Sequence, residues 1–183
     1  MACQSIVALP KACGSTAKVA GIEKVWMISY SDVAQISGTI SEIYTLSNSG
    51  VVNALGVTAG SSDKFVEIGI NRSSVGLDEK LTKNIELGNS FFTQTFKLTL
   101  TDLTTANRQF VESVLNQPVV VLVKSRTRNY FIAGLNGQLE LTDLEGGTGT
   151  KEEDLIGYNL TFTGIESMLV PLVDSTLIPN IIA

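Results

Sequence analysis

Apolar and polar side chains alternate along most of this chain, and the alternation predicts β-strands. In the stretch 91–101, Phe96, Leu98 and Leu100 alternate with residues that are mostly threonine, and the stretch 158–163 alternates in the same way. Threonine is β-branched and suits a pleated surface that is half in water. Sheets with one wet face are typically antiparallel. The pattern therefore predicts an antiparallel sheet with one apolar face and one threonine-rich face.

Two other stretches are apolar on both faces. Residues 24–32 and 119–124 read as buried strands, and the unbroken run of 119–124 predicts a central one. In the stretch 64–70, Val66 and Ile68 fall on one face together with Ile70. After the central strand we expect a meander, in which 130–135 returns, Asn136-Gly137 forms a two-residue turn and 138–142 runs out again.

One amphipathic helix interrupts the strands. Apolar residues between 104 and 117 recur at helical spacing, which predicts a single apolar stripe that lies on a sheet. Thr104 or Asp102 is expected to cap the start of this helix, and Pro118 to stop it. The predicted stripe consists of Ala106, Phe110, Val111, Val114 and Leu115.

These elements predict a mainly β fold, an antiparallel β-sandwich or half-barrel with one flanking α-helix. Residues 1–20 form an N-terminal segment and 21–167 the β domain. The tail 168–183 is apolar and is broken by two prolines. It is expected to be either a last edge strand or an arm that grips a neighbour, since apolar patches of that size usually have partners.

Composition adds to this picture. The chain has 183 residues, enough for one domain, and is 44% hydrophobic with a mean hydropathy of +0.24. Part of the apolar surface is therefore expected to lie against other subunits.

The run Val119–Val123 is far too short for a membrane helix, so no membrane partner is expected. The start of the chain is a poor signal peptide, and the spacing of Cys3 and Cys13 fits no redox or zinc motif, so a reducing setting is the default.

The chemistry of known enzyme sites is largely missing. The chain contains no histidine, which removes the commonest general base and the nucleophile systems that need one. In the stretch 146–154, Lys151 follows a threonine rather than a glycine, so no phosphate loop forms there. Glu152, Glu153 and Asp154 lack the spacing of a calcium loop. We therefore expect no enzyme activity, no cofactor and no metal.

Charge is concentrated in one segment. Between Gly137 and Gly157 lie six acids and the single base Lys151, which together equal the net charge of −5 of the whole chain. Such a segment usually marks a solvated loop or a surface that faces a partner. Gly146, Gly147 and Gly149 are expected to keep it mobile. The acids are Glu140, Asp143, Glu145, Glu152, Glu153 and Asp154.

A short basic run precedes the acidic segment. Lys124, Arg126 and Arg128 recur at every second residue, so an extended chain would point all three to one side. Three interpretations remain open: a charged strand end that blocks edge pairing, a patch that meets the acidic loop of an adjacent copy, and a nucleic-acid contact, which the absence of interleaved aromatics makes the weakest.

The order of elements resembles the tail tube proteins of tailed bacteriophages. The resemblance spans roughly residues 20–170, and it is carried by the closing "GYNLTFTG" of 157–164 with its following Glu166, and by "AGIEKVWMISYSD" of 20–32. It implies a β-sandwich-like domain whose subunits form rings, usually sixfold, with their sheets joined into one barrel around a channel for DNA. The rings stack head to tail, and other tail proteins join the virion. Such a protein is made in the cytoplasm of the bacterial host.

On that basis the stretch 146–157 is expected to be an assembly loop that meets Lys124, Arg126 and Arg128 of the next copy. Two alternatives remain. A ring or connector protein of the head–tail junction would share the fold but form one closed ring. A secreted β-sandwich that binds carbohydrate would be expected to show a signal peptide and a cluster of exposed aromatics.

Overall fold

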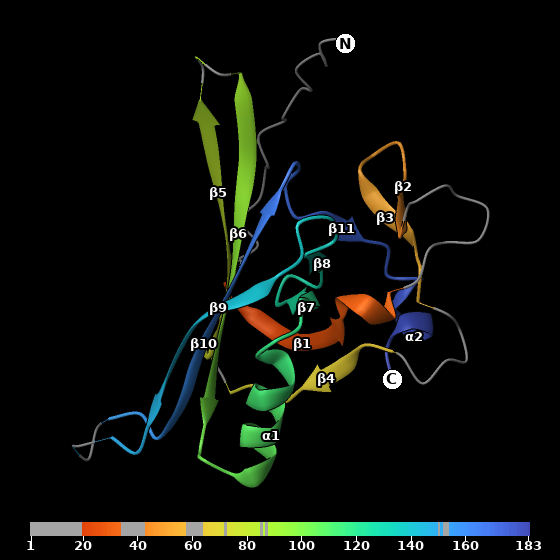
Figure 1. Cartoon of the computed structure of the whole chain (residues 1–183). Helices are drawn as coiled ribbons and strands as arrows, with labels where there is room; N and C mark the ends of the chain where they lie inside the picture. Colours follow the sequence, from red (N-terminus) through yellow and green to blue (C-terminus); the bar gives the residue numbers. More distant parts are fainter. Residues whose placement is uncertain are drawn as a thin grey trace.

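The described chain forms two β-sheets with helices at their margins. The computed structural model of the protein describes residues 20–33, 43–57, 64–71, 73–84, 86, 88–149, 151 and 154–183. Within these residues lie eleven strands, two α-helices and a short 3-10 helix at Tyr30–Asp32. Figure 1 shows one sheet at the side of the molecule, with a hairpin projecting from it at each end. The prediction of a mainly β chain is confirmed.

The larger sheet has seven strands and is mixed. All its neighbours are antiparallel except β11 and β3, which run parallel. In spatial order the strands are β2 (Tyr44–Leu46), β3 (Val51–Leu55), β11 (Leu172–Val173), β8 (Tyr130–Ala133), β7 (Val119–Ser125), β1 (Ile22–Ser29) and β4 (Val66–Ile68).

The smaller sheet has four strands and is antiparallel throughout. It consists of two hairpins whose long strands β6 and β10 pair in the middle. Its predicted apolar and threonine-rich faces are both present, since Phe96 and Leu98 are buried while Lys97 is exposed. In spatial order the strands are β5 (Val75–Asn84), β6 (Asn89–Thr101), β10 (Gly157–Glu166) and β9 (Glu140–Gly147).

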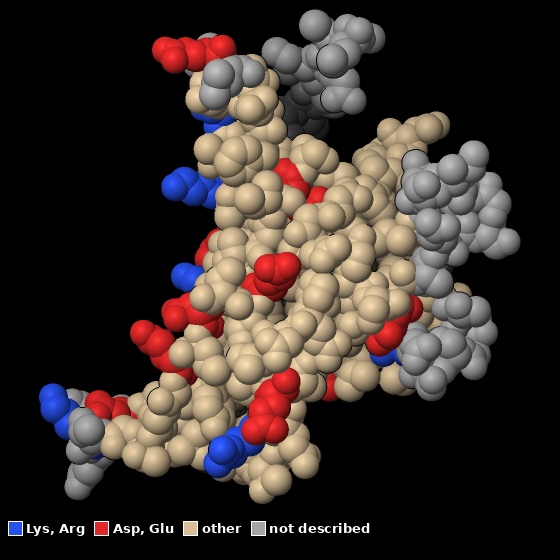
Figure 2. Space-filling model, viewed as in Figure 1, with Lys and Arg blue, Asp and Glu red and all other residues tan. Residues whose placement is uncertain are grey.

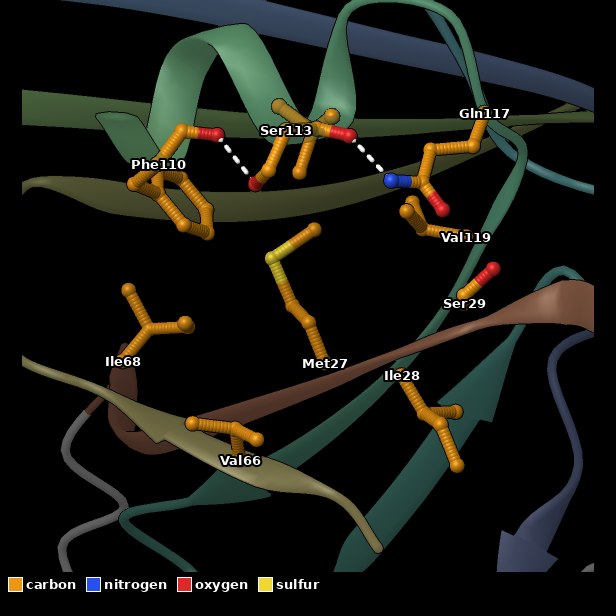
Figure 3. A pocket seen from close by; sticks show the side chains of 10 residues that line it. Met27, Ile28, Ser29, Val66, Ile68, Phe110, Ser113, Gln117 and Val119 are labelled. Carbon is orange, nitrogen blue, oxygen red and sulfur yellow. Dashed lines mark hydrogen bonds between the residues drawn. The ribbon is translucent and has the colours of Figure 1, made fainter. Parts of the chain in front are cut away.

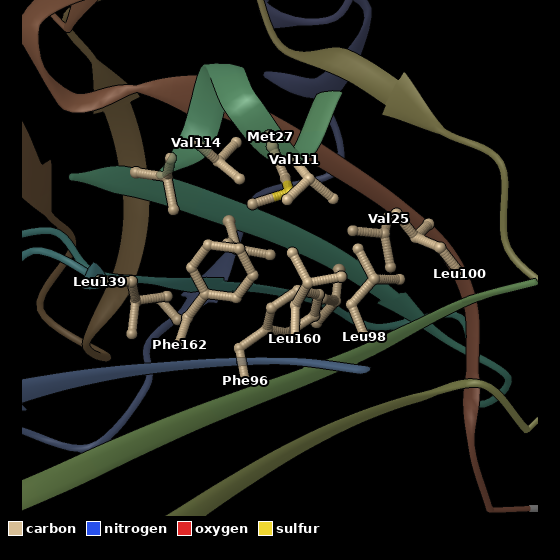
Figure 4. Close-up of a cluster of buried hydrophobic side chains, with 14 of the residues drawn as sticks. Val25, Met27, Phe96, Leu98, Leu100, Val111, Val114, Leu139, Leu160 and Phe162 are labelled. Carbon is tan, nitrogen blue, oxygen red and sulfur yellow. The ribbon is translucent and has the colours of Figure 1, made fainter. Parts of the chain in front are cut away.

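The main core lies between the apolar face of the four-stranded sheet, one face of the larger sheet and helix α1 (Thr105–Val114). Figure 4 shows Phe96 and Phe162 at its centre, with Val111 and Val114 of the helix above them. The two phenylalanine rings are 5.9 Å apart, centroid to centroid. A second cluster, which includes Trp26, covers the other face of the larger sheet. Burial on both faces explains the unbroken apolar run of β7.

Helix α1 begins as predicted. The Thr104 hydroxyl accepts a hydrogen bond from the N–H of Asn107 at 3.2 Å, so this side chain caps the first turn. The buried stripe is narrower than predicted, because Val111 and Val114 are buried while Ala106 and Leu115 are exposed.

The first half of the predicted meander is confirmed, since β8 returns antiparallel to β7, but the second half is wrong. Strand β8 belongs to the larger sheet and β9 to the smaller one, so the chain crosses between sheets at 134–139 instead of turning back. The N–H groups of Asn136 and Gly137 each donate to Oε1 of Glu166 over 2.8 Å. Gly137 is needed for space rather than for a turn, since a Cβ there would meet the Ile165 carbonyl at 1.7 Å. A buried carboxylate on β10 therefore holds the crossing in place.

The tail is neither an edge strand nor a free arm. Strand β11 lies between β3 and β8, inside the larger sheet. Helix α2 (Ile178–Ile181) buries both of its isoleucines in the second cluster. The N–H of Ala183 donates to the Phe65 carbonyl at 3.0 Å. Val170, Val173, Ile178 and Ile181 of the tail thus pack against their own chain, whereas Leu169 and Leu172 stay exposed.

Before helix α2 the carboxylate of Asp174 accepts a hydrogen bond from the N–H of Thr176 at 2.9 Å. The backbone and side chain of Thr176 together hold the pKa of this exposed carboxyl below its ordinary value.

Glu166 provides a test of how the two sheets are coupled. Glu166→Ala is expected to lower the free energy of unfolding by about 2–4 kcal/mol, because two backbone N–H groups lose their acceptor and a cavity is left. Glu166→Gln keeps an acceptor oxygen and should cost clearly less. Urea unfolding followed by the fluorescence of buried Trp26 measures both, and equal losses would contradict this role of the carboxylate.

Candidate self-assembly surface

The two outer edges of the four-stranded sheet have no strand neighbour among the described residues. Strand β5 pairs only with β6, and β9 pairs only with β10. Along an edge strand, alternate residues present N–H and C=O groups that can pair with another strand. Neither strand contains a proline, the residue that most directly prevents such pairing. Within the described part of the chain, both edges therefore leave backbone groups that could pair with another strand.

The two edges are staggered along the strand direction. Strand β5 pairs with residues 89–98 of β6, whereas β9 lies level with residues 95–101 of the same strand. The turn after Asn84 and the loop after Gly147 consequently project from opposite ends of the sheet (Figure 1). The sheet has the outline of a parallelogram rather than a rectangle.

The face of this sheet that points away from the core is hydroxylated and charged. Thr99 bonds Asn159 at 2.9 Å, and Thr142 shares a hydrogen bond with Thr163 at 2.9 Å, so the hydroxyls are tied across strands. Figure 2 shows charged side chains along this side of the molecule. The register places four acids and two bases on the face, namely Asp78, Glu140, Asp143, Glu145, Lys80 and Lys97.

Each edge also carries an exposed leucine on the core side of the sheet. Leu81 of β5 pairs with Phe92 and is 54% exposed, while Leu144 of β9 pairs with Leu160 and is 39% exposed. Both lie on the same side as the buried residues Phe96 and Leu98 because side chains alternate along a strand. The core of one chain leaves these two leucines partly uncovered.

The predicted basic patch has a different geometry. Strand β7 ends at Ser125, so Arg126 and Arg128 lie in the turn to β8 and the three side chains do not share one face of an extended strand. Lys124 forms an ion pair with Glu23 at 3.0 Å. The backbone of Arg126 bonds the Gly21 carbonyl at 3.1 Å. Arg128 is exposed, with φ of 69°. The strand ends before Arg126 and Arg128, so the tight turn between β7 and β8, and not the alternation of a strand, sets the directions of their side chains.

The predicted mobile loop is shorter than expected. Gly146 and Gly147 belong to strand β9, and only Gly149, with φ of 70°, lies in the loop beyond it. A side chain at position 146 would meet the Tyr158 ring at 2.4 Å, so close packing rather than mobility requires that glycine.

Beyond the strand, the carboxylate of Asp154 accepts a hydrogen bond from the N–H of Lys151 at 2.9 Å, which closes a local turn. Glu152 and Glu153 lie outside the described residues, as do Cys3 and Cys13. The role of this loop in an interface stays a prediction.

The sequence reasoning missed strand β5 and therefore the edge that carries Lys80 and Leu81. Residues 75–84 contain few apolar side chains, so their alternation is weak. Only an indirect feature of the sequence predicts a strand at residues 75–84. The long strand at 89–101 follows a short turn-like stretch, and a hairpin partner of similar length is expected before it.

An open apolar pocket of about 240 Å³ lies between α1, β1 and β4. Figure 3 shows Met27, Val66, Ile68 and Phe110 around it. Its polar side chains already bond within the chain: the Ser113 hydroxyl bonds the Phe110 carbonyl at 2.6 Å, Gln117 bonds the Ser113 carbonyl, and Ser29 shares a hydrogen bond with Ser31 at 2.8 Å. No charged group lines the pocket, so it has the chemistry for an apolar contact rather than for catalysis.

Within the part of the chain that the structure describes, no three Cys, Asp or Glu residues gather as a metal site would require. Neither described helix has the length and apolar character needed to cross a bilayer. Comparisons of the chain with protein-family models, with curated proteins and with solved structures found no match.

Substitutions at Gly146 and Gly147 of β9 test whether these glycines are required for close packing or for mobility. Gly146→Ala should lower the free energy of unfolding by about 1–3 kcal/mol, because the new methyl group displaces the Tyr158 ring. Gly147→Ala is the matched control, since among the described residues the nearest atom that a Cβ there would meet is the Gly149 nitrogen, at 4.0 Å. Urea unfolding compares the two, and equal effects would show that ring packing is not what requires glycine.

Proposed function

We propose that this chain is a structural protein that assembles into rings, which stack into the tail tube of a bacteriophage and enclose the channel for its DNA. The observation that carries the proposal is the pair of open, staggered edges on one four-stranded sheet. Edges of this kind are a hazard for a lone molecule and are removed when a sheet closes into a barrel.

The strand directions support a ring of identical copies. The four strands alternate in direction, so β9 and β5 run opposite to each other. When a second copy is added by rotation, its β5 meets β9 of the first copy in antiparallel orientation. The joined sheet then continues the same alternation across every seam, and rotation closes it into a ring. The sixfold number of copies is taken from the resemblance alone.

The wet face supports a channel lining. In a closed barrel the core side of the sheet stays outside, where each chain packs its own sheet and helix α1, so the hydroxylated face points inward. Its acids outnumber its bases by four to two. A surface of this kind repels phosphate, so DNA passes without specific binding.

The two projecting hairpins support stacking. They extend from opposite ends of the sheet, so one copy reaches the next ring above while receiving a hairpin from below. Such head-to-tail contacts do not close and therefore give a filament. Other tail proteins and a place in the virion follow from this function. A connector of the head–tail junction, with the same ring but no stacking, is the second candidate.

The carbohydrate-binding alternative has less support. The single Trp26 is 4% exposed and packs beside Tyr130 in the second cluster, so it offers no platform for a sugar ring. The absence of histidine, the commonest general base at neutral pH, gives an enzyme equally little support.

Negative-stain electron microscopy of the purified protein tests the proposal. We expect long tubes for the natural chain. A variant in which residues 83–90 are replaced by Asn-Gly keeps the pair Thr82–Phe91 and closes the hairpin with a two-residue turn. It should form separate rings, because the projecting hairpin is lost while residues 75–82 of the β5 edge remain. Single discs from the natural chain would favour the connector, and a monodisperse monomer at high concentration would exclude both.

Arg128 tests whether the basic turn meets the acidic loop of another copy. Arg128→Glu should slow tube elongation several-fold, because the stretch 151–154 would then face a like charge. Arg128→Gln removes the charge without reversing it and should give a smaller effect. Light scattering follows elongation, and unchanged rates in both variants would show that this turn is not at the interface.

A further inference from the structure

We propose a specific register for the seam between two copies, in which β9 of one chain pairs with β5 of the next so that Leu144 lies opposite Leu81 and Glu145 opposite Lys80. This inference rests on the proposed ring, and it names the residues that select the partner edge. It follows from three features of the described sheet: its pleat, its stagger and the charges along its two edges.

The pleat allows only every second register. Across one chain, Leu144 pairs with Leu160, Leu160 with Leu98, and Leu98 with Val75, so these four residues are level. A neighbour at the same height would put Val75 opposite Leu144. Sliding the neighbour by an odd number of residues would turn its core-side residues into the channel. The candidates are therefore slides of even length that move β5 toward full overlap with β9.

The geometry of a closed barrel limits the number of residues by which the neighbouring chain can be offset. With a rise of about 3.3 Å per residue and about 4.8 Å between strands, a slide of four or six residues per four strands tilts the strands by about 35° or 45°. A slide of two gives only about 20°, and eight gives about 55°, whereas closed barrels tilt by about 35–45°. The tilt does not depend on the number of copies. Only four and six fit.

The side chains choose between the two remaining registers. A slide of four places Glu145 opposite Asp78, a like-charge pair, and Leu144 opposite the carboxylate of Glu79. A slide of six places Glu145 opposite Lys80 and Leu144 opposite Leu81. Opposite charges and two apolar side chains directly across a strand pair stabilise it, whereas like charges destabilise it. The register of six is therefore favoured.

The neighbouring positions fit the same register. Gly146 then lies opposite Glu79, whose carboxylate already accepts the N–H of Val170 in its own chain, and the glycine leaves this contact undisturbed. Asp143 lies opposite Thr82, which carries no charge. The two leucines that one chain leaves exposed cover each other on the outer side of the barrel.

Disulfide trapping tests the register in the full chain, with Cys3 and Cys13 replaced by serine. Leu81→Cys combined with Leu144→Cys should cross-link copies into a covalent ladder at least about ten times faster than two matched pairs. The matched pairs combine Leu144→Cys with Glu79→Cys or with Lys83→Cys, which represent slides of four and eight on the same face. Circular dichroism of each variant before oxidation verifies the fold.

Charge reversal provides an independent readout. Lys80→Glu and Glu145→Lys should each lower the rate of ring formation about tenfold, and the double variant should recover most of it. The register is wrong if the natural chain forms rings or tubes but the cysteine pair 144/79 or 144/83 cross-links fastest. It is also wrong if the double charge variant does not recover the rate of ring formation. In both cases the proposed function stands. If the natural chain forms no ring at all, both fail.

Discussion

Among the described residues, the four-stranded sheet buries only one of its faces, and neither of its outer edges has a strand neighbour. Its apolar face packs Phe96 and Phe162 against the larger sheet and helix α1, and this packing fixes where every other surface of the sheet must point. The hydroxylated face and the edges of β5 and β9 are left over by that arrangement. Hydrogen-bonding groups on an unpaired edge are favourable to pair, so these edges are the places at which the proposed assembly would add further copies.

Glu166 links this sheet to the rest of the molecule. It sits at the end of β10, is 3% exposed, and holds the crossing from β8 to β9 through two backbone N–H groups. Strand β9 therefore starts from a fixed point, and its free edge keeps a defined height relative to β5. A seam register can be selective only if the two edges of each copy are held in constant relation, and this carboxylate contributes to that constancy.

The sequence predicted those elements whose signals are local. Strands β6, β7 and β10 and helix α1 each carry a clear period or an unbroken apolar run, and a capping threonine marks the helix start. The division of strands between the two sheets could not be predicted from local patterns. It involves contacts between residues far apart in the chain, such as the hydrogen bond from Gly137 to Glu166. The tail was misassigned because its apolar residues indicate burial but do not indicate whether the surface that buries them belongs to the same chain or to another copy. At the site, the acids of β9 were recognised, whereas β5 was missed because its edge is mostly polar.

The charges on the two edges also bear on which pairings are avoided. Charged residues on edge strands commonly prevent association, and β9, with Glu140, Asp143 and Glu145, would repel a second β9 in a two-fold dimer. Strand β5 carries bases as well as acids, so it can accept β9 in a suitable register. The same acids that would oppose a closed dimer are therefore compatible with the proposed β9-to-β5 contact. In the proposed assembly that contact is heterologous, and a heterologous contact repeats into a ring when its rotation closes, rather than ending at a pair.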